Sequence, residues 1–237
     1  MNSQELITEI RTYCLANADE ANVIRYSRYF KGVFNAYGLA NGQVESKVKE
    51  LLQDKAITIS LILEAAPELV KSEKYEETGF AVMMLNGCKK QYTSDVFKAI
   101  ESWFAYGIRN WAHADILGMW ILPDLVKQKV VVIEAFRPWL ASEYKFQRRC
   151  VPVTLIKSLK TMENLNSLLE FIEPLMSDPE REVHQGTGWF LREAWKINRE
   201  VTEKFLLKHK NTAPRLIIQY ATEKMTKEER LNYRREK

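Results

Sequence analysis

The 237-residue chain is 46% hydrophobic and 28% charged and has a net charge of +4, which is typical of a globular protein with a sizeable core. No apolar run approaches the roughly 18 residues of a membrane span, and the N-terminus lacks the basic start and apolar stretch of a signal peptide. These features argue against a membrane partner and favour a cytoplasmic protein. The even composition predicts one domain over 1–237.

The charges are unevenly distributed along the chain. Residues 1–144 carry 16 Lys and Arg against 18 Asp and Glu, whereas residues 145–237 carry 19 against 13. A basic half can follow a phosphate backbone, although solvated helix faces explain the same bias.

Apolar residues recur mainly at three- and four-residue spacing, which predicts an all-α fold. Helices of about 10 to 18 residues joined by short loops indicate antiparallel neighbours, stacked as an α-solenoid or α-α superhelix of degenerate HEAT-like helix pairs. Within this series we expect a helix start at Thr58 or nearby polar residues and an N-cap at Ser94-Asp95. We also expect a buried helix segment rather than a strand at 130–133, and a basic tail at 226–237 that can fray. The first apolar sets are Leu6, Ile10, Tyr13 and Cys14, then Val44, Val48, Leu51 and Leu52.

A basic and aromatic segment, VIRYSRYFKGVF, follows the first helical pattern. We expect Arg25, Tyr26, Arg28, Tyr29 and Lys31 to share one short helix. Basic residues interleaved with phenols are typical of a nucleic-acid surface, and also of an amphipathic helix whose long side chains reach solvent.

The segment GIRNWAHADILG contains a carboxylate near an indole. In a helix Trp111 and Asp115 are four residues apart and share a face. The carboxylate can therefore lie in a partly desolvated environment, where its electrostatic interactions are stronger than in water. Such a group can stabilise the cation that forms on a sugar when a glycosidic bond breaks. The alternative is an ordinary helix aspartate near a core tryptophan.

A third segment, EYKFQRRCVPVTLIKSLK, contains two consecutive arginines. The pattern places Phe146, Cys150 and Val153 on one face, turns Arg148 away from it and leaves Arg149 near the core edge. Arg148 at a helix start can hold a phosphate or form a surface salt bridge.

The segment SDPEREVHQGTGWFLREAWKIN predicts an amphipathic helix. Its expected core stripe comprises Val183, Thr187, Phe190, Ala194 and Ile197.

Gln185, Trp189, Arg192 and Lys196 fall on a different side of this helix. In that position Trp189 and Arg192 can contact a sugar, base or phosphate. The alternative is that a neighbouring helix covers the indole.

Metal and cofactor motifs do not occur in the sequence. Cys14, Cys88 and Cys150 are far apart and form no CxxC pair, so we predict buried, reduced thiols. His113 lies beside Asp115, but His184 and His209 are distant, so we expect no metal. No Walker loop, GxGxxG, GxSxG or HExxH pattern is present, which argues against nucleotide-driven and conventional hydrolase chemistry, and we expect no cofactor.

Taken together, these segments resemble the DNA alkylation repair family of AlkD-like glycosylases, roughly from Arg25 to Asn198 and in the same order. GWFLREAWK is similar to the family's Gly-Trp-x-Leu-Arg-Glu signature, so Trp189 and Arg192 match its functional positions. Trp111 and Asp115 match the Trp-x-x-x-Asp pair, Arg148 the phosphate-contacting Gln-Arg, and Tyr26 the N-terminal Arg-Tyr.

This resemblance implies a monomeric DNA glycosylase that removes cationic N3- or N7-alkylpurines from duplex DNA without a deep base pocket. Asp115 would stabilise the sugar cation, Trp111, Trp189 and Tyr26 would contact the lesion, and Arg148 and Arg192 would bind phosphates. The sequence departs from the family at Ala112, where active members commonly have an acidic residue. The alternatives are a non-catalytic protein that binds branched or damaged DNA and a protein-interaction scaffold.

Overall fold

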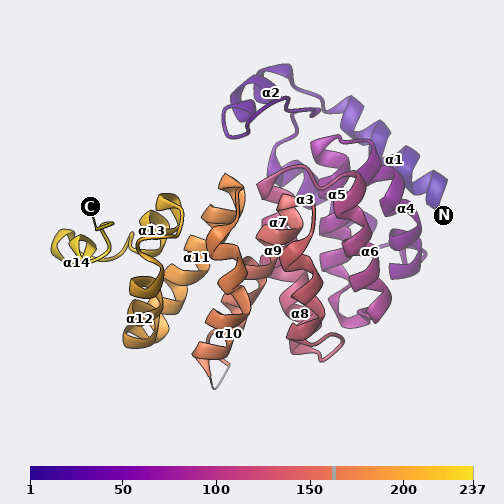
Figure 1. The fold of residues 1–237 in the computed structure, drawn as a ribbon. Coiled ribbons are helices and arrows are strands. Elements are labelled where there is room, and N and C mark those ends of the chain that lie inside the picture. The colour runs from indigo at the N-terminus through magenta and orange to yellow at the C-terminus, as the bar shows by residue number, and fades with distance from the viewer. Residues whose placement is uncertain (162–163, 237) are drawn as a thin grey trace. The chain divides into compact units, whose positions relative to one another are not determined.

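The computed structural model describes residues 1–161 and 164–236, and over those ranges the regular elements are all helical (Figure 1). This confirms the predicted all-α fold. Contacts between residues divide the chain into two compact units, Met1–Ile116 and Leu117–Lys237, and each is described by itself below. The single domain expected over 1–237 stays a prediction.

The first unit contains seven α-helices among its residues 1–116, all of which the structure describes. Helix α4 packs against α1, α5 and α6, and α5 also packs against α3 and α7, so near neighbours in the chain are neighbours in space. The helices are α1 (Ser3–Ala16), α2 (Glu20–Ser27), α3 (Asn41–Leu51), α4 (Ile59–Lys71), α5 (Tyr75–Gly87), α6 (Ser94–Tyr106) and α7 (Trp111–Ile116).

Helix α4 shows how the sequence determines these elements. The Thr58 side chain accepts a hydrogen bond from the Leu61 amide (3.3 Å), which confirms the expected helix start. Buried apolar residues then recur at helical spacing, and Ile62 and Leu69 are fully buried. Helix α6 begins one residue earlier than expected, because its N-cap is Thr93.

The connection between α2 and α3 is held to the body of the first unit by a buried carboxylate. Glu76, 2% exposed, accepts hydrogen bonds from the backbone amides of Tyr37 (2.8 Å), Gly38 (2.7 Å) and Leu39 (3.1 Å). Gly38 has φ +89°, and a Cβ at this position would meet the Asp19 carbonyl oxygen at 2.0 Å, so only glycine fits.

Helix α2 is shorter than the sequence suggested. It ends at Ser27, so the expected single helix through Lys31 is wrong. The chain turns instead, because Phe30 packs on Trp111 and the backbone of Gly32 is left-handed at φ +87°.

The second unit is built around α11, which packs mainly against α9 and α13. Its elements are a π-helical turn (Leu117–Ile121), α8 (Leu122–Lys127), a 3-10 helix (Ile133–Ala141), α9 (Lys145–Leu155), a 3-10 turn (Ile156–Ser158), α10 (Leu165–Ile172), a 3-10 helix (Glu173–Ser177), α11 (Arg181–Ile197), α12 (Arg199–His209), α13 (Arg215–Ala221) and α14 (Lys227–Leu231).

Most of the predicted core stripe of α11 is confirmed. Val183, Thr187, Phe190 and Ala194 are fully buried, whereas Ile197 is 47% exposed. The helix ends at Ile197, so this residue lies beyond the part of α11 that its neighbours cover.

Two other expectations for the second unit are corrected or refined. Residues 130–133 form a loop that enters a 3-10 helix, and Val132 is 65% exposed, so the expected buried helix segment is wrong. The expected fraying tail at 226–237 contains α14 and the buried Tyr233, which is 3% exposed. Lys237 lies outside the described residues.

Two further sequence-based expectations concern the whole chain. All three cysteines are free and buried, as expected. Among the helices of the described ranges, none is both long and apolar enough to cross a membrane.

Candidate functional site

Trp111 presents a partly exposed indole whose position is fixed from two sides. It is the first residue of α7 and is 39% exposed. Its ring stacks on Phe30, with centroids 5.6 Å apart and planes 18° from parallel, and its Nε1–H donates to the Tyr29 carbonyl oxygen at 3.2 Å. The segment after α2 therefore orients this indole while leaving part of it open to a ligand.

A series of stacked rings links Trp111 to the interior of the first unit. Phe30 stacks on Phe34 with centroids 4.6 Å apart, Phe34 lies 5.2 Å from Tyr75, and Tyr75 stacks on His113 at 4.6 Å. These ring contacts join the segment after α2 to Tyr75 of α5 and to the buried His113 of α7.

His113 lies between Trp111 and Asp115 in the chain and is only 2% exposed. Its Nδ1 lies 3.0 Å from the Asn110 Nδ2, and its backbone N–H donates to the Asn110 Oδ1 at 3.0 Å. Burial lowers the pKa of His113 to about 4. The imidazole is therefore neutral at physiological pH and lies against Tyr75 and Asn110 in the interior of the first unit.

Asp115 is half-buried in α7, one helical turn after Trp111. Positions i and i+4 of a helix lie on the same face, so the carboxylate and the indole share the face predicted from the sequence. A carboxylate in this setting can stabilise a developing cation or align a water molecule.

Tyr26 lies in the last turn of α2 and is half-buried. Its hydroxyl oxygen accepts a hydrogen bond from the Arg25 guanidinium at 2.7 Å, and the same guanidinium lies 4.8 Å from the ring centroid. The contacts to Trp111 come from Tyr29 and Phe30. The lesion contact expected of Tyr26 stays a prediction.

In the second unit Arg148 is held by a buried carboxylate. Its Nε and Nη2 donate to the two carboxylate oxygens of Asp178 at 2.6 and 3.2 Å, and its Nη1 donates to the Ser142 carbonyl oxygen at 2.6 Å. The side chains of Arg148 and Asp178 are 11% and 4% exposed. These contacts occupy much of the five-donor guanidinium fork, so a phosphate would have to compete with them.

Trp189 and Arg192 lie on the half-buried side of α11. Arg192 forms ion pairs with Glu193 (3.1 Å) and with Glu223, whose side chain is 47% exposed. A phosphate can displace the exposed Glu223 more readily than it can displace Asp178, because exposed ion pairs contribute little free energy, whereas Glu193 is 23% exposed. The predicted roles of Trp189 and Arg192 remain untested.

The structure thus places the predicted site residues in two groups. Tyr26, Trp111 and Asp115 belong to the first unit, and Arg148, Trp189 and Arg192 belong to the second. Among the residues that the structure describes, no three His, Cys, Asp or Glu side chains lie close enough together to hold a metal ion.

Sequence reasoning missed the residues that support these groups. Phe30 and Tyr75 orient Trp111 and His113, Glu76 secures the segment after α2, and Asp178 binds Arg148. The only signals were the aromatic content of RYSRYF and the Ser-Asp-Pro turn before α11.

Comparison with known families now assigns the chain. The family model described as DNA alkylation repair enzyme matches residues 10–225. The chain belongs to this family. Membership of a DNA alkylation repair family indicates DNA as the partner. None of the curated proteins compared with the chain by sequence matches it.

Solved structures share the fold of this DNA alkylation repair family member. A predicted DNA alkylation repair enzyme from Enterococcus faecalis is 14% identical, with a TM-score of 0.76 over 89% of this chain and 98% of that chain. AlkD2 from Streptococcus mutans is 19% identical, with a TM-score of 0.59 over 86% of this chain and 97% of that chain. At these identities the likeness concerns the fold.

Proposed function

We propose that the protein is a DNA glycosylase that excises cationic N3- or N7-alkylated purines from duplex DNA in base-excision repair. The observation that carries this proposal is the oriented, partly exposed indole of Trp111 one helical turn from Asp115. Membership of the DNA alkylation repair family supports the same substrate class.

The reaction breaks the bond between the sugar C1′ and the purine nitrogen. The bonding electron pair moves to the base and neutralises its positive charge, so the base leaves without protonation. Positive charge then develops on the sugar, where Asp115 stabilises it, and a water molecule adds to C1′ and loses a proton.

The environment of Asp115 suits this role. His113 is neutral at physiological pH, since burial lowers its pKa to about 4. Helix α7 therefore carries no positive charge at His113 that would weaken the field of the Asp115 carboxylate. Trp111, held by Phe30, can lie against the deoxyribose and exclude water from the reacting centre.

We assign the second group to binding. Trp189 would contact the lesion's sugar, and Arg192 and Arg148 would bind flanking phosphates. Arg192 is the more available of the two arginines because its partner Glu223 is 47% exposed, whereas Asp178 is 4% exposed. No deep base-flipping pocket is part of this proposal, since the cationic base is already a good leaving group.

A second candidate is a non-catalytic protein that binds branched or damaged DNA. Ala112 favours it, because an acidic residue commonly follows the tryptophan in active members of the family. This protein would bind duplex DNA in a salt-sensitive way but release no base.

The test is release of 7-methylguanine or 3-methyladenine from methylated duplex DNA, with unmethylated duplex as the control. Release that depends on enzyme concentration is expected. Salt-sensitive binding of both duplexes without release of either base would contradict the glycosylase proposal and support the second candidate.

A further inference from the structure

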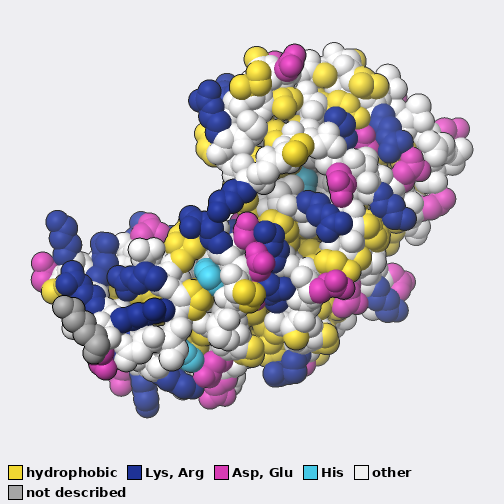
Figure 2. Space-filling view, turned by 45° about the horizontal axis from the view of Figure 1, so that its top comes forward, with side chains coloured by type: hydrophobic (Ala, Val, Ile, Leu, Met, Phe, Trp, Pro, Cys, Tyr) yellow, Lys and Arg dark blue, Asp and Glu magenta, His cyan; other side chains and the backbone are white. Residues whose placement is uncertain are grey.

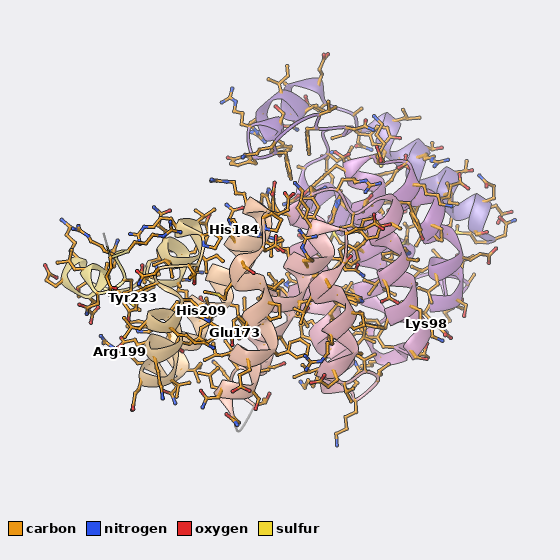
Figure 3. All side chains as sticks on the ribbon, viewed as in Figure 1. Lys98, Glu173, His184, Arg199, His209 and Tyr233 are labelled. Carbon is orange, nitrogen blue, oxygen red and sulfur yellow. The ribbon has the colours of Figure 1, made fainter. Side chains whose placement is uncertain are left out.

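The C-terminal segment of the chain is docked onto the second unit by charged contacts and buried side chains. Arg199 pairs with Glu229, and Lys210 pairs with Glu236 at 2.6 Å. Tyr233, 3% exposed, is covered at the same end of the unit as Arg199, as the side-chain view shows (Figure 3). Segment 226–236 is therefore an ordered part of the surface, and it lies beyond residues 10–225 that the family model covers.

This docking leaves a group of arginines bound to uncharged acceptors. Arg215 donates to the Tyr233 carbonyl oxygen at 3.2 Å, Arg230 to the Met225 carbonyl oxygen at 3.0 Å, and Arg235 to the Ala213 carbonyl oxygen at 2.9 Å. A carbonyl group orients a guanidinium but does not neutralise its charge.

Three acidic residues of this part of the unit are paired with other cations, and Glu228 of α14 is exposed. Glu229 and Glu236 bind Arg199 and Lys210, and Glu223 binds Arg192 and Lys224. Arg215, Arg230, Arg234 and Arg235 are all exposed, and within 1–161 and 164–236 none of them forms an ion pair with an Asp or Glu.

We propose that these four exposed side chains, Arg215, Arg230, Arg234 and Arg235, form a C-terminal arginine surface that binds the sugar-phosphate backbone of duplex DNA. Figure 2 shows Lys and Arg side chains gathered on the part of the second unit where α12–α14 lie. The choice of duplex DNA rests on the proposed function. The surface itself goes beyond that function, because it is distinct from Arg148 and Arg192.

The chemistry of the surface favours phosphate over other ligands. A guanidinium fork can bind phosphate oxygens in pairs, and backbone carbonyls already hold three of these side chains in place, which reduces the entropy lost on binding. Membrane attachment needs inserted apolar side chains as well as cations, and Leu231, 50% exposed, is the apolar side chain that α14 exposes.

The test compares two variants that remove equal charge. The first replaces all four arginines of the C-terminal arginine surface with Gln. The matched control replaces four exposed lysines of the first unit with Gln: Lys49, Lys55, Lys90 and Lys98. Affinity for an undamaged, fluorescently labelled duplex is measured from 50 to 200 mM salt.

The arginine variant should bind at least tenfold more weakly at 100 mM salt. The slope of its log K against log salt should be less steep by about 3 to 4, since each phosphate contact contributes about 0.9 to that slope. The lysine control should keep the wild-type slope. Because Arg215 and Arg235 also help to join the docked segment to the rest of the unit, Arg234→Gln alone serves as a second variant, and its slope of log K against log salt should be less steep by about 0.9.

Equal slopes for the arginine variant and the lysine control would overturn the inference, as would a wild-type protein that does not bind duplex DNA. Loss of binding to phosphatidylserine vesicles with unchanged binding to DNA would also overturn it and assign the surface to lipid. The readout uses undamaged DNA and no base release, so it separates this inference from the proposed function. Even if the wild-type protein releases no base, the arginine variant can still show a smaller salt slope than the wild type.

Discussion

The indole of Trp111 lies on the ring of Phe30, with centroids 5.6 Å apart and planes within 18° of parallel. This contact joins the segment after α2 to the start of α7, the helix that carries Asp115. It makes Phe30 a positioning residue for the proposed chemistry, although 81 positions separate the two rings in the sequence.

Replacing Phe30 with Ala should slow base excision about tenfold, because an indole that loses its stacking partner samples unproductive positions. The measurement is the single-turnover rate on a duplex with one 7-methylguanine. Val33→Ala is the control, since Val33 is 97% exposed in the same segment. An unchanged rate in Phe30→Ala would remove Phe30 from the site.

The burial of His113 makes stability depend on pH. In the unfolded chain this imidazole takes up a proton near pH 6.5, whereas in the folded protein its pKa is about 4. The unfolded state therefore binds more protons between these values, and the free energy of unfolding falls as the pH is lowered from about 6.5 towards 4.

The expected loss attributable to His113 between pH 7.5 and pH 5 is about 2 kcal/mol. Urea unfolding at the two pH values measures it. His209, whose pKa burial also lowers, acts in the same direction, so His113→Gln is compared with wild type. The variant should show a smaller difference between the two pH values, and an equal difference would show that His113 is not the source.

Gly188, the residue before Trp189, permits a close contact between α11 and α13. A Cβ at this position would lie 2.5 Å from the Tyr220 Cβ and 2.9 Å from the Ile217 carbonyl oxygen. Gly188→Ala should therefore lower the free energy of unfolding by about 1 to 2 kcal/mol, despite the better helix propensity of Ala.

The matched control is Gly42→Ala in α3, where nothing lies within 4 Å of an added Cβ. The free energy of unfolding of this variant should rise by up to about 1 kcal/mol. Denaturant titrations of both proteins test the contrast. A Gly188→Ala protein as stable as Gly42→Ala would mean that α13 shifts without cost.

The two arginines assigned to phosphates should differ in their contribution to stability. Arg148→Ala leaves the carboxylate of Asp178 buried without its guanidinium and should cost about 3 kcal/mol, whereas Arg192→Ala breaks pairs with the more exposed Glu193 and Glu223 and should cost about 1 kcal/mol. Thermal unfolding distinguishes these values. Equal losses would show that the Arg148–Asp178 pair is not structural.

The sequence predicted the elements whose determinants are local. Helical periodicity identified the buried positions Val183, Thr187, Phe190 and Ala194 of α11, and Thr58 as a helix start. Ile197 was assigned to the same stripe because periodicity does not show where neighbouring helices stop covering a helix.

The supporting contacts could not be predicted, because each joins residues that are distant in the chain. Asp178 binds Arg148 across 30 positions, and Tyr75 stacks on His113 from another helix. At 130–133 propensity suggested a strand and the surrounding helical pattern a buried helix segment, but the structure has a loop that enters a 3-10 helix.

The central claim is that Asp115 stabilises the sugar cation, and the single-turnover rate of 7-methylguanine release by Asp115→Asn tests it most directly. Asp95→Asn is the control, because Asp95 is a 72% exposed carboxylate of the same unit. We predict a 100- to 1000-fold lower rate for Asp115→Asn, about the loss caused by removing one electrostatic group, with unchanged DNA affinity and an unaffected control. Release by Asp115→Asn at the wild-type rate would contradict the account.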